Sequence, residues 1–154
     1  MRLGQEVQAL PRDALKGLPR IARQRILVVA AALYDAHGQV LIAERPAGKH
    51  MAGRWEFPGG KVDRDESERA ALERELREEL GVEVESALPL MRLTHTYDDR
   101  EVELSLWVIG GYRGTPRPRE RQRLKWVAPA RLADEDILEA DQPFIAALQA
   151  RAAR

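Results

Sequence analysis

The chain has 154 residues, with 25 Lys and Arg against 25 Asp and Glu, so its formal net charge is zero when the three histidines are neutral. This length corresponds to one domain and allows a hydrophobic core without disulfides or a structural metal. The absence of cysteine excludes disulfide scaffolds, thiolate zinc sites and cysteine nucleophiles. A balanced charge also argues against a general electrostatic grip on nucleic acid, so we expect no stable nucleic-acid complex.

Apolar segments are short throughout the chain. The longest, residues 26–33, falls well below the roughly 18 residues of a membrane span and begins too deep in the chain for a signal-peptide core. We therefore expect no membrane association and a cytoplasmic location.

Residues 1–25 form a basic N-terminal extension, with six Lys and Arg against two Asp and Glu, a local charge of +4. Pro11, Gly17 and Pro19 interrupt any long helix there. The extension is interpreted either as a surface segment or short helix packed on the domain, or as an arm that contacts phosphate or nucleic acid, or as a targeting sequence. We place the folded domain at residues 26–154.

The first half of this domain is predicted to open with two strands. The apolar run 26–33 is typical of a strand buried on both faces. A turn at 35–39 and a second strand at 40–43 follow. Residues 46–60, which contain Gly and Pro, are predicted to form a loop.

The second half is predicted to contain two helices and two further strands. A helix over residues 65–81 has leucines every four residues, Asp65 as its N-cap and Gly81 as its stop. Alternation over 101–108 predicts a half-buried strand, and 124–127 another. A closing helix spans 144–152, so the fold class is α/β or α+β, with helices packed on a sheet.

Three carboxylates of the 65–81 helix share one face. On a helical wheel, Glu75, Glu78 and Glu79 lie beside the leucine face, and their like-charge pairs each cost about 0.2–0.5 kcal/mol. A hard divalent cation such as Mg²⁺ would relieve this repulsion and complete its shell with water and phosphate oxygens. The alternative is a solvated acidic face, softened by neighbouring arginines.

The same segment carries a longer motif. Gly60, five residues, Glu66, seven residues and then the run R-E-L-R-E-E-L-G-V over 74–82 match the complete Nudix box, so the chain resembles the Nudix hydrolases. Flanking residues, including W-E-F-P-G-G-K at 55–61, resemble the branch of 8-oxo-dGTP diphosphatases. The resemblance covers residues 26 to about 150.

This resemblance implies a Nudix-type α/β/α sandwich, with a mixed β-sheet between helices, and a hydrolase acting on a small-molecule nucleoside triphosphate. The products would be a nucleoside monophosphate and diphosphate. Mg²⁺, with Mn²⁺ as a substitute, would be held by side chains and the Gly59 carbonyl. Glu75 is expected to orient or deprotonate the attacking water, and Glu120 competes for that role. The implied metal ligands are Gly59, Glu75, Glu78, Glu79 and Glu120.

The resemblance also implies roles for four further residues. Arg74 is expected to buttress a carboxylate, and Glu66 is either catalytic or a first-turn acid satisfying the helix N-terminus. Arg45 and Lys61 would contact phosphate. Each of the last two is otherwise a solvated surface charge.

Base recognition is where the chain departs from the 8-oxo-dGTP diphosphatases. Arg100 and main-chain groups near Phe57 match, but Asp141 stands where those enzymes carry an asparagine. An ionised carboxylate only accepts hydrogen bonds, so Asp141 is protonated in an apolar pocket, or the pose or the base differs. A carboxylate also suits the amine of cytosine. The remaining alternative is that Asp141 is the N-cap of the closing helix.

We therefore predict an 8-oxo-dGTP diphosphatase, with a CTP or dCTP pyrophosphohydrolase as the alternative. A nucleotide-binding sensor without activity is disfavoured by the intact box. The zero net charge conceals two opposed patches: ten acids and five bases over 61–85, net −5, and six bases and one acid over 113–125, net +5. Monomer and homodimer both remain open.

Overall fold

The computed structural model describes residues 24–153, so most of the predicted basic extension lies outside the described residues. Neither helix of the described part is long and apolar enough to span a membrane. The elements follow one another as β1 (Gln24–Leu33), β2 (Val40–Glu44), β3 (Trp55–Glu56), β4 (Gly59–Lys61), α2 (Glu68–Leu80), β5 (Glu83–Thr96), β6 (Arg100–Arg113), β7 (Leu124–Val127), the 3₁₀ helices η2 (Pro129–Asp134) and η3 (Glu139–Asp141), and α3 (Gln142–Ala152).

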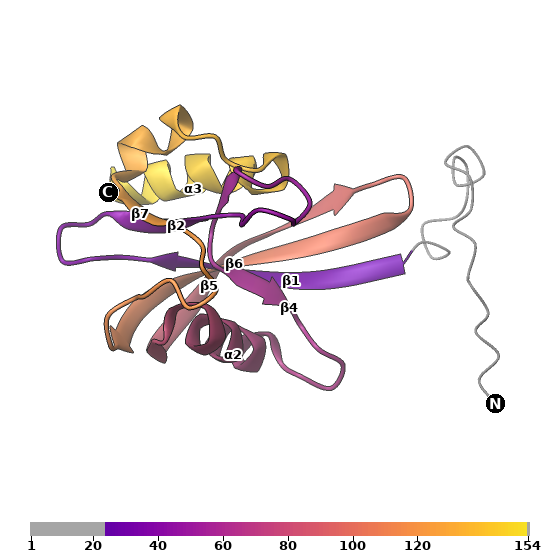
Figure 1. The fold of residues 1–154 in the computed structure, drawn as a ribbon, viewed down its shortest axis with the longest axis horizontal. Helices are drawn as coiled ribbons and strands as arrows, with labels where there is room; N and C mark the ends of the chain where they lie inside the picture. Colours follow the sequence, from indigo (N-terminus) through magenta and orange to yellow (C-terminus); the bar gives the residue numbers. More distant parts are fainter. Residues whose placement is uncertain (1–23, 154) are drawn as a thin grey trace.

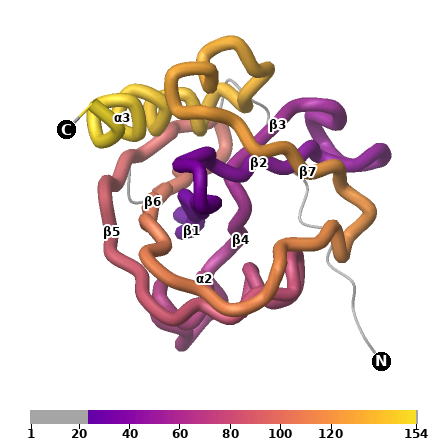
Figure 2. The backbone as a smooth tube through the Cα atoms, turned by 90° about the vertical axis from the view of Figure 1, so that its left-hand side faces the viewer, coloured from indigo at the N-terminus to yellow at the C-terminus, as the bar shows by residue number. Residues whose placement is uncertain are grey.

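Two sheets form the centre of the domain. The first has the order β4-β1-β6-β5, in which β1 runs parallel to β6 and antiparallel to β4, and the second is the antiparallel β3-β2-β7 sheet. The helices α2 and α3 lie on opposite sides of this centre (Figures 1 and 2). The predicted class, a mixed sheet between helices, is confirmed.

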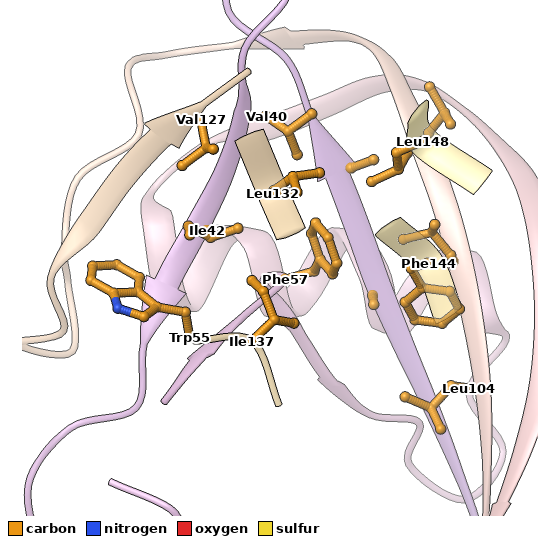
Figure 3. Packing of buried hydrophobic residues seen from close by; sticks show 14 residues of the cluster. Val40, Ile42, Trp55, Phe57, Leu104, Val127, Leu132, Ile137, Phe144 and Leu148 are labelled. Atoms are coloured by element: carbon orange, nitrogen blue, oxygen red, sulfur yellow. The ribbon is translucent and has the colours of Figure 1, made fainter. Parts of the chain in front are cut away.

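The second half of strand β1, residues 29–33, is buried on both faces because it contributes to two hydrophobic cores, while residues 26–28 of the predicted buried run are only half-buried. Ala30 and Ala32 belong to one cluster, here called the α3 core, which Figure 3 shows. Val29, Ala31 and Leu33 belong to the other, the α2 core. The α3 core also contains Val40, Ile42, Trp55, Phe57, Leu104, Leu106, Val108, Val127, Leu132, Ile137, Phe144 and Leu148. The α2 core also contains Leu41, Ala71, Leu72, Leu76, Leu80, Val82, Ala87 and Ile109.

The helix α2 begins later than the sequence predicts. Its N-cap is Ser67, whose side chain accepts a hydrogen bond from the backbone N–H of Ala70 at 3.1 Å. Asp65, the predicted cap, has a left-handed backbone with φ of 66° and precedes the helix. The predicted stop is correct, because Gly81 takes the left-handed conformation with φ of 72°.

Three strands were not predicted. The edge strand β5 contains Pro89 and several register shifts against β6, so its apolar residues do not alternate regularly. The short strands β3 and β4 lie at the end of the predicted 46–60 loop, and both pair antiparallel with longer strands. The pairing of β4 with β1 places the glycine-rich segment at the edge of the four-stranded sheet, directly beside β1.

Candidate active site

Gly59 brings β4 against β1. Its φ is 155°, and a Cβ added there would lie 1.9 Å from the backbone oxygen of Val29. Only glycine fits this contact. The missing side chain is therefore needed for the packing of β4 against β1, in addition to the role that the resemblance implies for the Gly59 carbonyl.

Gly60 makes room for a carboxylate of α2. A Cβ at position 60 would lie 2.4 to 2.6 Å from the carboxyl atoms of Glu75. The two successive glycines of the motif therefore serve different neighbours, the backbone of β1 and the side chain of Glu75. Together they fix how closely α2 approaches the sheet.

One cavity of about 500 Å³ gathers most of the predicted site residues. Carboxylates of α2, the glycines of β4 and positively charged side chains share its wall with apolar residues of β1 and β6. Arg74, Glu66 and Arg100 do not line it. The lining residues are Val28, Val29, Ala30, Arg45, Lys49, Glu56, Phe57, Gly59, Gly60, Lys61, Glu75, Glu78, Glu79, Leu104, Glu120 and Asp141.

Arg74 lies behind the cavity and ties its acids to the loop before α2. Its guanidinium forms a two-bond fork with Glu66, each bond 2.9 Å long, and donates to Glu75 Oε1 at 2.9 Å. The contact with Glu78 is longer, 3.5 Å. Arg74 therefore does contact carboxylates as expected, but its two short hydrogen bonds go to Glu66 and not to Glu78.

Glu66 precedes the helix and does not satisfy its N-terminus. Its Oε1 accepts from the backbone N–H of Asp63 at 3.0 Å, in addition to the fork from Arg74. These interactions, with the Arg74 hydrogen bonds first, lower the pKa of Glu66 to about 2. The first-turn interpretation of Glu66 is therefore wrong, and its place behind Glu75 fits a supporting role.

The acids that line the cavity repel one another. Burial raises the pKa of Glu79 to about 9, and the charges of Glu75 and Glu120 add to this shift. The backbone N–H of Gly59, which donates to Glu79 Oε2 at 3.3 Å, acts in the opposite direction. Burial also raises the pKa of Glu75, and Arg74 opposes it. A bound cation would favour the ionised forms of these carboxyls, which burial and mutual repulsion disfavour in its absence.

The donor set of the cavity fits a hard divalent ion. Its potential ligands are carboxylate and carbonyl oxygens, without sulfur or imidazole among the lining residues. Within residues 24–153, however, no group of three or more acidic or histidine side chains is arranged to hold a metal ion. Arg74 engages Glu75 and Glu78, so an ion would have to compete with its guanidinium for their oxygens.

Asp141 reaches the cavity from η3, directly before α3, whereas the acid cluster comes from α2 on the other side of the central sheets (Figure 1). It occupies the N-cap position of α3, but its side chain makes no capping hydrogen bond. Instead, Oδ2 accepts from the backbone N–H of Phe57 at 3.2 Å. Its residue is only 6% exposed, and burial raises the pKa of its carboxyl to about 7. The capping interpretation is therefore wrong, and the expected apolar environment is present.

Arg45 is held at the cavity wall by two partners. Its Nε donates to the backbone oxygen of His50 at 2.7 Å, and its Nη1 to Glu56 Oε2 at 3.0 Å. Burial raises the pKa of Glu56, while Arg45 opposes the shift. The guanidinium is thus oriented before any substrate binds. Lys61 also lines the cavity, as an exposed residue of β4.

Arg100 is the predicted residue that the structure places elsewhere. It begins β6 at the turn after β5, where its guanidinium lies 5.1 Å from the centre of the Tyr97 ring. It is paired in register with Gln24 of β1. The predicted contact of Arg100 with the base does not follow from this arrangement.

Three further residues belong to the site and were not found from the sequence. Glu56 and Lys49 line the cavity, and the buried Gln122 contacts the loop that carries Glu120. Glu56 lies within the W-E-F-P-G-G-K segment, which was a usable signal. Lys49 and Gln122 stand outside any motif or periodic pattern.

Comparison with known proteins shows which family the chain is related to. The NUDIX domain family profile matches residues 29–147. The CTP pyrophosphohydrolase of Escherichia coli K12 is 40% identical over 131 residues, covering 84% of this chain and 97% of that protein. The putative 8-oxo-dGTP diphosphatase 2 of Mycobacterium tuberculosis is 42% identical over 127 residues, covering 79% and 86% respectively. A structure from a study of MutT from Aliivibrio salmonicida and Vibrio cholerae has a TM-score of 0.74 at 32% identity, covering 83% of this chain and 99% of that one.

The fold, the motif and these relatives define a hydrolase of phosphorus anhydrides. The chain belongs to the Nudix family and is a Nudix hydrolase. Nudix hydrolases use divalent metal ions and act on small-molecule nucleotides. The relatives named for CTP and for 8-oxo-dGTP are similarly identical to this chain, so identity alone does not choose between these substrates.

Proposed function

We propose that this protein is a Mg²⁺-dependent pyrophosphohydrolase that converts a nucleoside triphosphate and water to a nucleoside monophosphate and diphosphate. The observation that carries the proposal is the composition of one cavity. Acids of α2 and Glu120 line it together with the positively charged Arg45, Lys49 and Lys61, and Asp141 reaches it from the α3 side. This combination suits a metal-bound polyphosphate that carries a base.

Mg²⁺, when bound, would neutralise the polyphosphate and lower the pKa of a coordinated water. In the proposal it is held by Glu75, Glu78, Glu79, Glu120 and the Gly59 carbonyl. Glu75 orients the water and accepts its proton, while Glu120 is the competing base. The water oxygen bonds to the β-phosphorus, and the bond from that phosphorus to the oxygen shared with the α-phosphate breaks, so that oxygen leaves with the monophosphate. Mn²⁺ is the expected substitute.

The first proposed substrate is 8-oxo-dGTP, which the enzyme would remove from the nucleotide pool before DNA synthesis. The support is Asp141, whose carboxyl is buried and has a pKa of about 7. Its protonated form can donate to O6 of 8-oxoguanine, which an ionised carboxylate cannot do. Because Oδ2 accepts from Phe57, Oδ1 is the oxygen left for the base.

The second candidate is a cytidine triphosphate, CTP or dCTP or a modified form. An ionised Asp141 offers Oδ1 as an acceptor for the exocyclic amine of cytosine. A relative named CTP pyrophosphohydrolase, 40% identical over nearly its whole length, supports this alternative.

Hydrolysis of 8-oxo-dGTP, dGTP, CTP and 5-methyl-dCTP at saturating Mg²⁺ tests both candidates. We expect the highest kcat/KM for 8-oxo-dGTP, with monophosphate and diphosphate as the products. A preference for CTP would replace the first substrate by the second. Binding of a nucleotide without turnover would replace the enzyme by a sensor.

The remaining expectations concern the cellular location, the oligomeric state and nucleic-acid binding. We propose a cytoplasmic protein, monomeric or homodimeric, that forms no stable nucleic-acid complex. The zero net charge supports the last point. Gel filtration with light scattering measures the oligomeric state.

A further inference from the structure

Residues 114–123, here called the capping segment, join β6 to β7 and pack on the carboxyl end of α2 (Figure 2). The last carbonyl groups of a helix have no partner within the helix. The backbone N–H of Arg117 donates to Leu80 O at 2.9 Å, and that of Arg119 to Glu79 O at 3.1 Å. The capping segment therefore satisfies the end of the helix that carries the acid cluster.

Gln122 adds a side-chain connection between the capping segment and α2. Only 7% of this residue is exposed, although its side chain is polar. Its Nε2 donates to the backbone oxygen of Glu79 at 3.0 Å, and its Oε1 accepts from the backbone N–H of Glu120 at 2.8 Å. One buried amide thus links the main chains of two cavity acids, 41 positions apart in sequence (120 minus 79).

The link opposes an electrostatic repulsion. Glu120 and Glu79 line the same cavity, so their carboxylates repel one another when both are ionised. Repulsion would move the more exposed Glu120 away from α2, since a surface loop yields more easily than a packed helix. Arg121, with a left-handed φ of 60°, keeps the turn between Glu120 and Gln122 tight. The hydrogen bonds of Gln122 hold Glu120 beside the helix.

We propose that Gln122 is a positioning residue, whose amide fixes the Glu120 loop to α2 and thereby sets the affinity of the acid cluster for its divalent ion. The inference rests on the proposed function, because it uses the assignment of Glu120 as a metal ligand. Gln122 itself does not line the cavity, so it acts through Glu120.

Gln122→Met tests the link, because methionine has a similar length but neither hydrogen bond. Calorimetric titration with Mn²⁺ alone should show about tenfold weaker binding, as is typical when the support of a metal ligand is lost. The Mg²⁺ concentration for half-maximal hydrolysis should rise by a similar factor. The KM for nucleotide at saturating Mg²⁺ should change less than about twofold.

Gln149→Met is the matched control. Its Nε2 also donates to a backbone oxygen, that of Pro129 at 3.2 Å, but it joins α3 to η2 away from the cavity. We expect its Mn²⁺ affinity to equal that of the wild type. If Gln122→Met does not fold, Gln122→Asn keeps the amide with a shorter reach and should show the same weaker Mn²⁺ binding.

A double-mutant cycle separates positioning from a general loss of structure. If Gln122 acts through Glu120, adding Gln122→Met to Glu120→Gln should weaken Mn²⁺ binding by less than about twofold more. Full additivity of the two effects would overturn the inference. Hydrogen exchange of the backbone amides over 114–123 should become faster in Gln122→Met and stay unchanged in Gln149→Met.

Different experimental results would contradict the role of Gln122 and the proposed function. Unchanged amide exchange and unchanged Mn²⁺ affinity in Gln122→Met would overturn the role of Gln122, whatever the enzyme hydrolyses. A wild-type protein that hydrolyses no triphosphate would overturn the proposed function. The exchange and Mn²⁺ measurements would still show whether Gln122 holds the Glu120 loop, because they need no turnover.

Discussion

The backbone N–H of Phe57 donates to Oδ2 of Asp141 across 3.2 Å, which joins residues 84 positions apart. The Phe57 ring itself packs against Phe144 of α3 in an edge-to-face arrangement, with the ring centres 6.2 Å apart (Figure 3). Asp141 is therefore held by a main-chain group beside the glycine-rich strand β4. This contact connects the start of α3 with the segment that leads to Gly59, one of the proposed metal ligands.

Asp141→Asn should shift substrate preference toward 8-oxo-dGTP. The asparagine oxygen can accept from Phe57 N–H, and its amide can donate to O6 without first binding a proton. A gained base contact is worth about 1–3 kcal/mol, so the ratio of kcat/KM for 8-oxo-dGTP over CTP should rise about tenfold. Steady-state kinetics on both nucleotides measure it, with Asp134→Asn, an exposed residue of η2, as the control. An unchanged ratio would show that Asp141 does not read the base.

Glu75→Gln should lower kcat by at least about a hundredfold and leave the fold intact, since it removes a proposed metal ligand and base. Glu73→Gln is the control on the same helix. Glu73 pairs with Arg69 and does not line the cavity, so its variant should keep nearly full activity. Circular dichroism and thermal unfolding check that both variants fold. Near-normal turnover in Glu75→Gln would contradict the role assigned to it.

The two motif glycines should respond differently to alanine. In Gly59→Ala the new Cβ meets the backbone of Val29, so β4 must separate from β1 and the protein should lose about 2–3 kcal/mol of stability. In Gly60→Ala the three atoms nearest the new Cβ are those of the Glu75 carboxylate, a side-chain group that can turn away. That variant should unfold nearly as the wild type does in urea, yet lose at least about tenfold in kcat. Equal loss of stability in both variants would be inconsistent with this difference.

Without metal, the protein should become less stable as the pH rises from about 5 to 9. The ordinary pKa of a glutamate is 4.5, whereas the folded protein keeps the Glu79 proton to about pH 9. Between these values the folded state binds more protons than the unfolded state, so its free energy of unfolding falls with rising pH. Thermal unfolding in EDTA across this range measures the slope.

Glu79→Gln should flatten this pH dependence, because the neutral amide has no proton to lose. Mg²⁺ should raise the Tm of the wild type most at the alkaline end, where the acids are ionised, and raise that of the variant much less. A wild-type slope equal to that of Glu79→Gln would show that Glu79 titrates normally.

Periodicity was sufficient to predict the elements that build the centre of the fold. The buried run of β1, the leucines of α2 and the stop at Gly81 reflect burial and backbone geometry that neighbouring residues encode. The edge strand β5 was missed because Pro89 and its register shifts interrupt the pattern. The cap of α2 was placed at Asp65 instead of Ser67, since both residue types cap helices and only the backbone decides between them.

The residues of the candidate site likewise include some that the sequence could predict and some that it could not. The Nudix box gave the acids of α2 because its spacing is tied to helical geometry. Gln122 was missed because its role depends on a loop meeting the end of a distant helix, a contact that no local pattern encodes. Arg100 was assigned to the base by alignment alone, and the structure places it at the β5–β6 turn.

The shared use of β1 by two cores has a consequence for ligand response. The cavity acids Glu75, Glu78 and Glu79 are carried by α2, whose leucines fill the α2 core, while Asp141 directly precedes α3, which packs in the α3 core. A nucleoside triphosphate that contacts both the α2 acids and Asp141 would connect the two cores, which otherwise meet across the central sheets. Diphosphate has no base to contact Asp141, so the product should hold the two cores together less firmly than the substrate does.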